Sequence, residues 1–388
     1  MENANEQIKS ILDQLVNSGV EVGLQVAAYL DGKLIVDACA GVADQATGCS
    51  VSRDTLFVAA SCTKGIVSTC IHILADKGVL DYDTPIVHFW PEFAANGKEL
   101  VTVRHVLSHT AGIPQLPDGI TLEMMCDWEE MCTAIAALPP LWEPGSKTGY
   151  HAMTFGWILG EVVRRVDSRP ISQFVRDEIC LPLGISDIYL GIPDDVEDRV
   201  ATCTAPPPPP NTPAIPPELL FLRTVPLSML TPAGMNRSDL RRACIPSAFG
   251  IMNARSLARH YDALIHSGKM HKNQILSQER VSIAIQLQTE NFDEVVGPIP
   301  GYPQPCRKAL GYWLGGPRYP AESYHGAMGL RDTTFGHPGA GGMVAFADLE
   351  QRFSFALLKN LSTPLWATGP DSAYIVANAV RTALGLRE

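Results

Sequence analysis

The sequence contains no uninterrupted apolar stretch of about 18 residues, the length a membrane-spanning helix needs. It has no basic run, and its formal net charge is −11, so we expect neither a membrane nor a nucleic acid as a partner. The opening MENANEQIKSILDQLVNSG lacks a basic start followed by an apolar segment. No export signal is therefore expected, and the chain is predicted to be cytoplasmic.

Several motifs of other enzyme and metal-binding classes are also missing. None of the ten cysteines forms a C-x-x-C pair, so we expect reduced thiols rather than a zinc knuckle or a redox motif. The G-x-S-x-G elbow is absent, which argues against an α/β-hydrolase fold. His105 and His109 are four residues apart, but no glutamate follows the first histidine, so a structural helix is favoured over a metal site. No metal and no cofactor are predicted.

What the chain does contain is enough apolar material for a large core, with 46% hydrophobic residues among 388. Residues 23–42 alternate around the turn Asp31-Gly32, which predicts a β-hairpin. Two further apolar runs flank DLEQR near the other end, and a helix is expected at 370–385. An antiparallel sheet could therefore be built from both chain ends. We predict one domain from 1–80 with 300–388, and a mostly helical one from 81–299.

The stretch APPPPPNTPAIPPE, residues 205–218, cannot form a helix or a central strand. We expect it to be a stiff, extended surface segment that serves as a connector. The apolar stretch after it, LLFLRTVPLSML, is either the wall of a pocket or ordinary core.

The segment FVAASCTKGIVSTC places Ser61 and Lys64 three residues apart at the expected start of a buried helix that ends near Gly78. A serine hydroxyl becomes a good nucleophile only when a base takes its proton. A lysine can be that base if burial lowers its pKa. Lys64 could instead stay charged beside a phenol, or be a salt-bridged surface residue.

Two further segments could supply partners for this pair. In EPGSKTGYHAMTFGWILGEVV, Tyr150 lies between a turn and a helical stretch, where its hydroxyl could reach a cleft or simply pack. In FGHPGAGGMVAFAD, glycines precede a strand and would let the backbone approach a ligand. His337 in this segment is either a ligand contact or a plain loop residue.

These three segments, in this order, resemble the serine β-lactamase and penicillin-binding-protein superfamily, in particular its class C-like branch and the family VIII carboxylesterases. DTLFVAASCTKG, VLDYDTPIVHFWPEF, VTVRHVLSHTAGIP and GWILGEVV are also similar to family stretches. The resemblance covers roughly residues 20–385. It implies an α+β fold, with an antiparallel sheet flanked by helices, a mostly helical second domain, and the site between them.

The resemblance also implies roles for individual residues. Ser61 would be the acylated nucleophile, with Lys64 and Tyr150 as general base and acid. The N–H groups of Ser61 and Ala340 would form the oxyanion hole. Substrate contacts are expected from the positions that follow the family's tyrosine and strand motifs, namely Ala152, His337, Gly339 and Gly341.

The chain departs from the family pattern at two of these positions. Ala152 stands where β-lactamases carry an asparagine, and His337 stands where they carry the lysine of Lys-Thr-Gly. Both changes favour uncharged esters over β-lactams. A literal KTG at 147–149 precedes Tyr150 in an expected loop, so we interpret it as unrelated to the strand motif.

The sequence therefore predicts a carboxylesterase that acts on small-molecule esters with short to medium acyl chains. The alternatives are a β-lactamase, DD-peptidase or acyltransferase of the same fold, and a catalytically inactive binding relative. The oligomeric state is not predicted.

Overall fold

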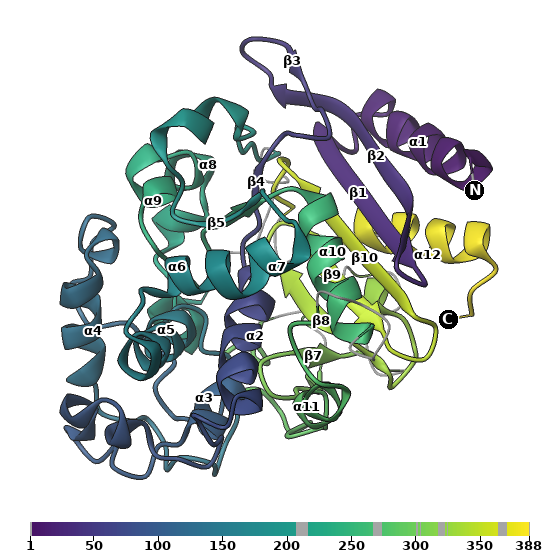
Figure 1. Ribbon diagram of the computed structural model, residues 1–388. Helices are drawn as coiled ribbons and strands as arrows, with labels where there is room; N and C mark the ends of the chain where they lie inside the picture. The colour runs from purple at the N-terminus through teal and green to yellow at the C-terminus, as the bar shows by residue number, and fades with distance from the viewer. Residues whose placement is uncertain are drawn as a thin grey trace.

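The computed structural model describes residues 2–206, 216–266, 274–299, 302, 304–316, 323, 325–363 and 371–387. Its main feature is a seven-stranded antiparallel sheet in the order β3-β2-β1-β10-β9-β8-β7 (Figure 1). The strands are β1 Gly23–Leu30, β2 Lys33–Asp44, β3 Cys49–Ser50, β7 Trp313–Leu314, β8 Thr334–Gly339, β9 Met343–Asp348 and β10 Phe353–Lys359. Both ends of the chain thus contribute to one sheet, as the sequence predicts.

The predicted hairpin is confirmed at β1 and β2. Asp31 and Gly32 both have positive φ, +51° and +76°, which is the backbone of a two-residue hairpin turn. On the other side of β1, Ala27 pairs with Ala356 of β10. The N-terminal hairpin is therefore joined directly to the C-terminal strands.

Every residue of β10 is buried, because helices cover both faces of the sheet. On one face, Ser354 Oγ donates a hydrogen bond of 2.9 Å to Ala258 O in α10 (Ala254–Ile265). On the other face, Phe355 stacks on Phe346, and the guanidinium of Arg381 in α12 (Ser372–Leu384) lies over the Phe346 ring. Helix α1 (Glu2–Asn17) packs beside α12.

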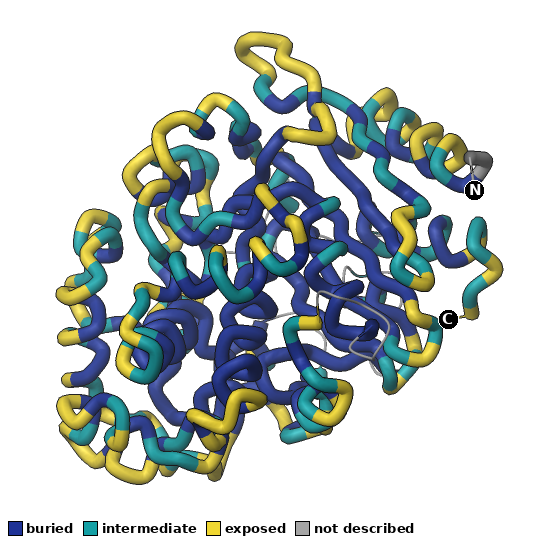
Figure 2. Tube along the Cα trace, viewed as in Figure 1, coloured by how far each residue is buried: buried dark blue, intermediate teal, exposed yellow. Residues whose placement is uncertain are grey.

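A group of helices beside the sheet surrounds α2 (Thr63–Asp76), whose residues are buried as far as Ala75 (Figure 2). Helix α2 contacts α5, α6, α11 and the strand β8. The other helices are α3 Val103–Leu107, α4 Trp128–Ala136, α5 Thr154–Asp167, α6 Ile171–Val175, α7 Leu181–Leu183, α8 Pro232–Met235, α9 Ser238–Arg242 and α11 Gln278–Ala284. Because α2 lies between these helices and the sheet, its N-terminus is at the junction of the two parts.

Short elements complete the junction. A small sheet, in the order β4-β6-β5, joins Phe57–Val58, Gly250–Met252 and Ile188–Leu190. The remaining turns of helix are η1 Ile86–His88, η2 Pro91–Ala94, η3 Met124–Cys126, η4 Arg176–Cys180, η5 Asp194–Arg199, η6 Leu220–Arg223, η7 Leu227–Leu230 and η8 Gly326–Met328. Most of the proline-rich segment, 207–215, lies outside the described residues.

Two expectations about helices are refined by the structure. The structural helix expected to hold both His105 and His109 is α3, which ends at Leu107, so His109 lies beyond its end with φ +60°. His105 Nδ1 instead accepts the Thr102 N–H in a capping box, so it has a structural role at the helix start. Among the described helices, none combines the length and hydropathy that crossing a bilayer requires.

A close contact between α2 and α10 generates the first prediction. A Cβ at Gly65 would lie 2.2 Å from Tyr261 Oη, and that side chain is fully buried. Although alanine is the better helix former, overpacking of this kind costs about 1–3 kcal/mol. We expect Gly65→Ala to lower the free energy of unfolding in urea, and Tyr261→Phe to restore most of it in the double variant. A Gly65→Ala protein as stable as the parent would contradict this packing.

Candidate active site

Ser61 lies in the turn between β4 and α2, two residues before the helix rather than in its first turn as expected. The preceding residue, Ala60, has φ +45°, a conformation that is strained for a residue with a Cβ. The Ala60 carbonyl is held by the N–H of Thr63 at 3.1 Å and by its hydroxyl at 2.6 Å. This fixed turn places the Ser61 side chain at the wall of a pocket.

Lys64 is fully buried one turn further along. Its Nζ donates hydrogen bonds to Ala152 O at 2.8 Å and to Ser247 O at 2.9 Å, and it lies 3.3 Å from Ser61 Oγ. Within the described part of the chain, no carboxylate contacts the amine. The interpretation of Lys64 as a salt-bridged surface residue is therefore wrong.

Burial lowers the pKa of the Lys64 amine well below its ordinary value. A neutral amine has two N–H donors and one lone pair. Two carbonyl oxygens and one hydroxyl surround the nitrogen, so the neutral form satisfies all of them. In the structure Nζ donates to both carbonyls and to Ser61 Oγ; a neutral amine that keeps the bonds to Ala152 O and Ser247 O would have its lone pair left for the Ser61 hydroxyl.

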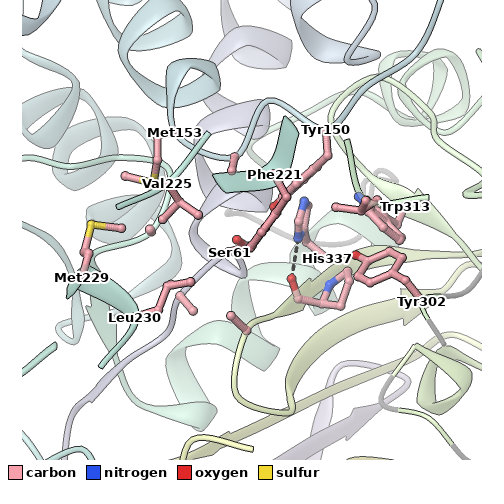
Figure 3. Close-up of a pocket in the computed structure, with 16 residues that line it drawn as sticks. Ser61, Tyr150, Met153, Phe221, Val225, Met229, Leu230, Tyr302, Trp313 and His337 are labelled. Carbon is pink, nitrogen blue, oxygen red and sulfur yellow. Dashed lines mark hydrogen bonds between the residues drawn. The ribbon is translucent and has the colours of Figure 1, made fainter. Parts of the chain in front are cut away.

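Tyr150 lies above this pair, and its side chain is directed toward Ser61 and His337 (Figure 3). Lys64 Nζ is 4.9 Å from the centre of its ring. The ring of His109 packs at 4.9 Å and the edge of Trp313 at 6.0 Å, so the phenol has little freedom. The structure thus brings the three predicted catalytic side chains together at one place.

His337 is buried in β8 and faces the same pocket. Its Nδ1 donates a hydrogen bond of 2.6 Å to Pro338 O, which leaves Nε2 as an acceptor. Burial lowers its pKa well below the ordinary histidine value, so the ring is neutral at physiological pH. The strand motif therefore supplies no fixed positive charge.

The expected oxyanion donors are both at the pocket. Ser61 and Ala340 line it from opposite chain segments, and neither N–H donates a backbone hydrogen bond within the described residues. Two N–H groups without protein acceptors can stabilise negative charge on a substrate oxygen.

The pocket itself is a cavity of about 640 Å³, part of which is open to solvent. None of its described lining residues is an Asp, Glu, Lys or Arg, and most are apolar. Met153, Val225, Met229 and Leu230 lie on one side of Ser61, while Tyr302 and Trp313 lie on the other (Figure 3). The remaining lining residues are Ala60, Tyr150, Ala152, Phe221, Ala248, Val296, His337, Pro338 and Ala340.

The other predicted contacts have different outcomes. Ala152 lines the pocket, but Gly339 faces Ala59 O and Cys62 Sγ, and Gly341 lines a second, smaller pocket. Residues of the segment 219–230 do form a pocket wall. In the literal KTG, Lys147 is exposed and pairs with Glu294 at 3.4 Å, so it does not belong to the strand motif.

Sequence reasoning missed Ser247 and the aromatic wall. Ser247 supplies a carbonyl to Lys64, and its hydroxyl donates to Met153 O and accepts the Gly156 N–H. It occurs in an ordinary loop, IPSAFG, with no motif to identify it. Trp313 lies on the short edge strand β7, and only the fold brings it beside Tyr150.

Comparisons with known proteins agree with this architecture. The Beta-lactamase family matches residues 8–379. The protein "Esterase/beta-lactamase LipL" of Mycobacterium tuberculosis is 34% identical over 375 residues, which cover 93% of this chain and 82% of that protein.

Solved structures give the same result. A family VIII carboxylesterase superposes with a TM-score of 0.84 at 29% identity, covering 98% of this chain and 97% of the other. A penicillin-binding protein homologue from Caulobacter crescentus does so with a TM-score of 0.84 at 32% identity and the same coverage. The chain therefore belongs to the beta-lactamase family, as the resemblance implied, and these matches support a serine hydrolase.

The state of Lys64 generates the second prediction. If the neutral amine is the base, kcat/KM for an ester rises with pH through the lowered Lys64 pKa and then stays level, because the active form is the deprotonated one. The rise should be complete well below about pH 10.4, the ordinary lysine value. The measurement is a pH–rate profile of the parent protein.

His337→Gln is the control for this profile, because it removes another group of the pocket whose pKa burial lowers. We expect that variant to keep the rise, and Lys64→Met to lower kcat/KM by about 10³-fold. A profile centred near the ordinary lysine pKa would contradict the assignment.

Proposed function

We propose that this protein hydrolyses carboxylic esters through an acyl-enzyme on Ser61. The observation that carries the proposal is the fully buried Lys64 amine, 3.3 Å from Ser61 Oγ, at a pocket whose described walls hold no charged side chain. The amine can take the proton that makes Ser61 a nucleophile. The uncharged walls favour an uncharged, largely apolar substrate.

In acylation, Lys64 and Tyr150 jointly take the proton of Ser61, and Oγ attacks the ester carbonyl carbon. The carbonyl oxygen becomes an oxyanion between the N–H groups of Ser61 and Ala340. As the tetrahedral intermediate collapses, the bond to the alcohol oxygen breaks and Tyr150 protonates the leaving alcohol. Lys64 returns its proton to Tyr150, which restores both groups.

Deacylation uses the same groups in reverse. A water molecule takes the position that the alcohol has left and gives its proton to Tyr150 and Lys64 as its oxygen attacks the acyl carbon. The bond to Ser61 Oγ then breaks, and the serine recovers its proton. The acid is released, and the residues are again in their starting protonation states.

The pocket supports esters over β-lactams. A β-lactam carries a carboxylate that needs a cation or strong donors, whereas His337 is neutral and Ala152 has no polar side chain atom. The name of the mycobacterial relative includes both activities, so a weak β-lactamase activity is the second candidate.

The acyl chain has an apolar place to bind. The aliphatic wall beside Ser61 includes Met153, Val225 and Met229, and Phe221 lies between this wall and Tyr150 in the view of Figure 3. Each methylene that enters such a wall contributes about 0.8 kcal/mol of transfer free energy. We propose short to medium acyl chains as the substrates, with Phe221 as the residue that limits their length.

Replacement of the nucleophile is the third prediction. Ser61→Ala should abolish hydrolysis of p-nitrophenyl butyrate and labelling by a fluorophosphonate, because no other group forms the acyl-enzyme. The matched control is Ser146→Ala at an exposed turn serine, which should leave both unchanged.

The same assay separates the alternatives. We expect nitrocefin turnover by the parent protein to be at least about 10³-fold below ester turnover in kcat/KM, from the loss of about 4 kcal/mol of charge-assisted binding. Nitrocefin turnover equal to ester turnover would favour a β-lactamase. A parent protein that neither hydrolyses esters nor reacts with the probe would favour a binding relative.

Pocket depth is the fourth prediction. Phe221→Ala should move the preferred p-nitrophenyl ester to longer acyl chains, with a gain of about fourfold in kcat/KM for each added methylene that is newly buried. Leu222→Ala, next in the chain but not among the described lining residues, is the control and should leave the preference unchanged. An unchanged chain-length profile for Phe221→Ala would place the acyl group elsewhere.

A further inference from the structure

A buried ion pair contacts the backbone of Tyr150. Asp293 is fully buried, and its carboxylate forms an ion pair with Lys308, whose side chain is 1% exposed. Neither residue is among the described lining residues of the pocket, and the mechanism above does not use them. A fully buried ion pair is costly to form, and breaking it by removing one partner leaves an uncompensated charge.

The Asp293 carboxylate holds the backbone of the catalytic tyrosine. Its Oδ1 accepts the N–H of Tyr150 at 3.1 Å, and also those of Val295 and Val296 at 2.9 Å each. Val296 lines the pocket. One oxygen atom therefore fixes both the Tyr150 loop and part of the pocket wall.

Lys308 holds the same loop at the preceding residues. Besides its ion pair, its Nζ donates a hydrogen bond of 2.9 Å to Thr148 Oγ1. The Thr148 carbonyl in turn accepts the N–H of Glu294 at 2.9 Å. The loop before Tyr150 is thus tied to the segment around Asp293 by two side chains and a backbone contact.

Lys308 also connects this loop to the aromatic wall. Its backbone forms antiparallel bridges with Thr289 and with Trp313, and the Trp313 ring edge packs against Tyr150. The phenol is therefore restrained through its own N–H and through the strand that carries its ring neighbour. Both restraints meet at the Asp293–Lys308 pair.

We propose that Asp293 and Lys308 are positioning residues that keep the Tyr150 hydroxyl in place to protonate the leaving alcohol. This inference rests on the proposed function, since it assigns the pair a role in that reaction. A pair that only stabilised the fold would reduce the number of active molecules but not change which substrates they prefer.

The leaving group separates the two roles. An ethyl ester needs its alkoxide protonated, whereas p-nitrophenolate departs without a proton, so loss of the Tyr150 proton affects the ethyl ester more. The experiment measures kcat/KM of Asp293→Asn and of the parent on the ethyl and p-nitrophenyl esters of the same acid. Each value is divided by the number of active sites counted by fluorophosphonate labelling. A displacement of a catalytic group by about 1 Å can lower the rate about 10²-fold. We expect kcat/KM of Asp293→Asn to fall by that factor for the ethyl ester and by less than about tenfold for the p-nitrophenyl ester.

Tyr150→Phe sets the reference and Asp262→Asn is the matched control. Asp262 is a buried carboxylate on α10, bound to Arg259 at 2.8 Å and to His266 at 3.1 Å, away from the pocket residues. Its replacement should leave the ratio of the two esters unchanged even if it lowers the thermal midpoint. Thr148→Val removes the hydroxyl that accepts from Lys308 at 2.9 Å and donates to His109 O at 3.5 Å, and it should shift the ratio in the same direction if Asp293→Asn does not fold.

Each outcome has one meaning. If Tyr150→Phe loses both esters equally, Tyr150 acts only with the base, and its role as the acid that protonates the leaving alcohol fails, whatever the pair does. If Tyr150→Phe loses more activity on the ethyl ester than on the p-nitrophenyl ester, but neither Asp293→Asn nor Thr148→Val does so, the positioning role is overturned and the proposed function stands. Selective loss of the ethyl ester in the tyrosine variant and in the pair variants supports both.

Discussion

The proposed chemistry depends on one buried amine that no carboxylate contacts among the described residues. Lys64 is fully buried beside Ser61, and the groups that bind its nitrogen are two carbonyls and one hydroxyl. A carboxylate at this place would favour the charged amine, which has no lone pair to accept the serine proton. Because no described carboxylate contacts it, burial lowers the lysine pKa well below its ordinary value, which favours the form that can accept a proton.

Most of the architecture around the site serves to build this environment. The strained turn at Ala60 places Ser61, while the loops that precede α5 and β6 deliver the two carbonyls to Lys64. Charged pairs are present nearby, but Asp293 and Lys308 neutralise each other next to the Tyr150 backbone. The pocket can therefore be apolar and still contain groups that move a proton.

Local patterns in the sequence predicted the parts of the fold that they control. The Asp31-Gly32 turn, the strands around DLEQR and the C-terminal helix are all confirmed, because turn chemistry and periodicity are encoded within a few residues. The approach of Ser61, Lys64 and Tyr150 was expected from their motifs. The Ser247 carbonyl and Trp313 could not be predicted, since a backbone oxygen has no sequence signal and tertiary packing alone brings these residues to the site.

The most direct test of the central claim is the charge on Lys64 itself. Lysine labelled with ¹³C at Cε reports protonation of its amine by NMR, and comparison with Lys64→Met assigns the resonance. We expect the Lys64 signal of the free protein to change to that of a neutral amine well below about pH 10.4, where ordinary lysines titrate. A Lys64 signal that remains charged until it titrates with the surface lysines would contradict the account.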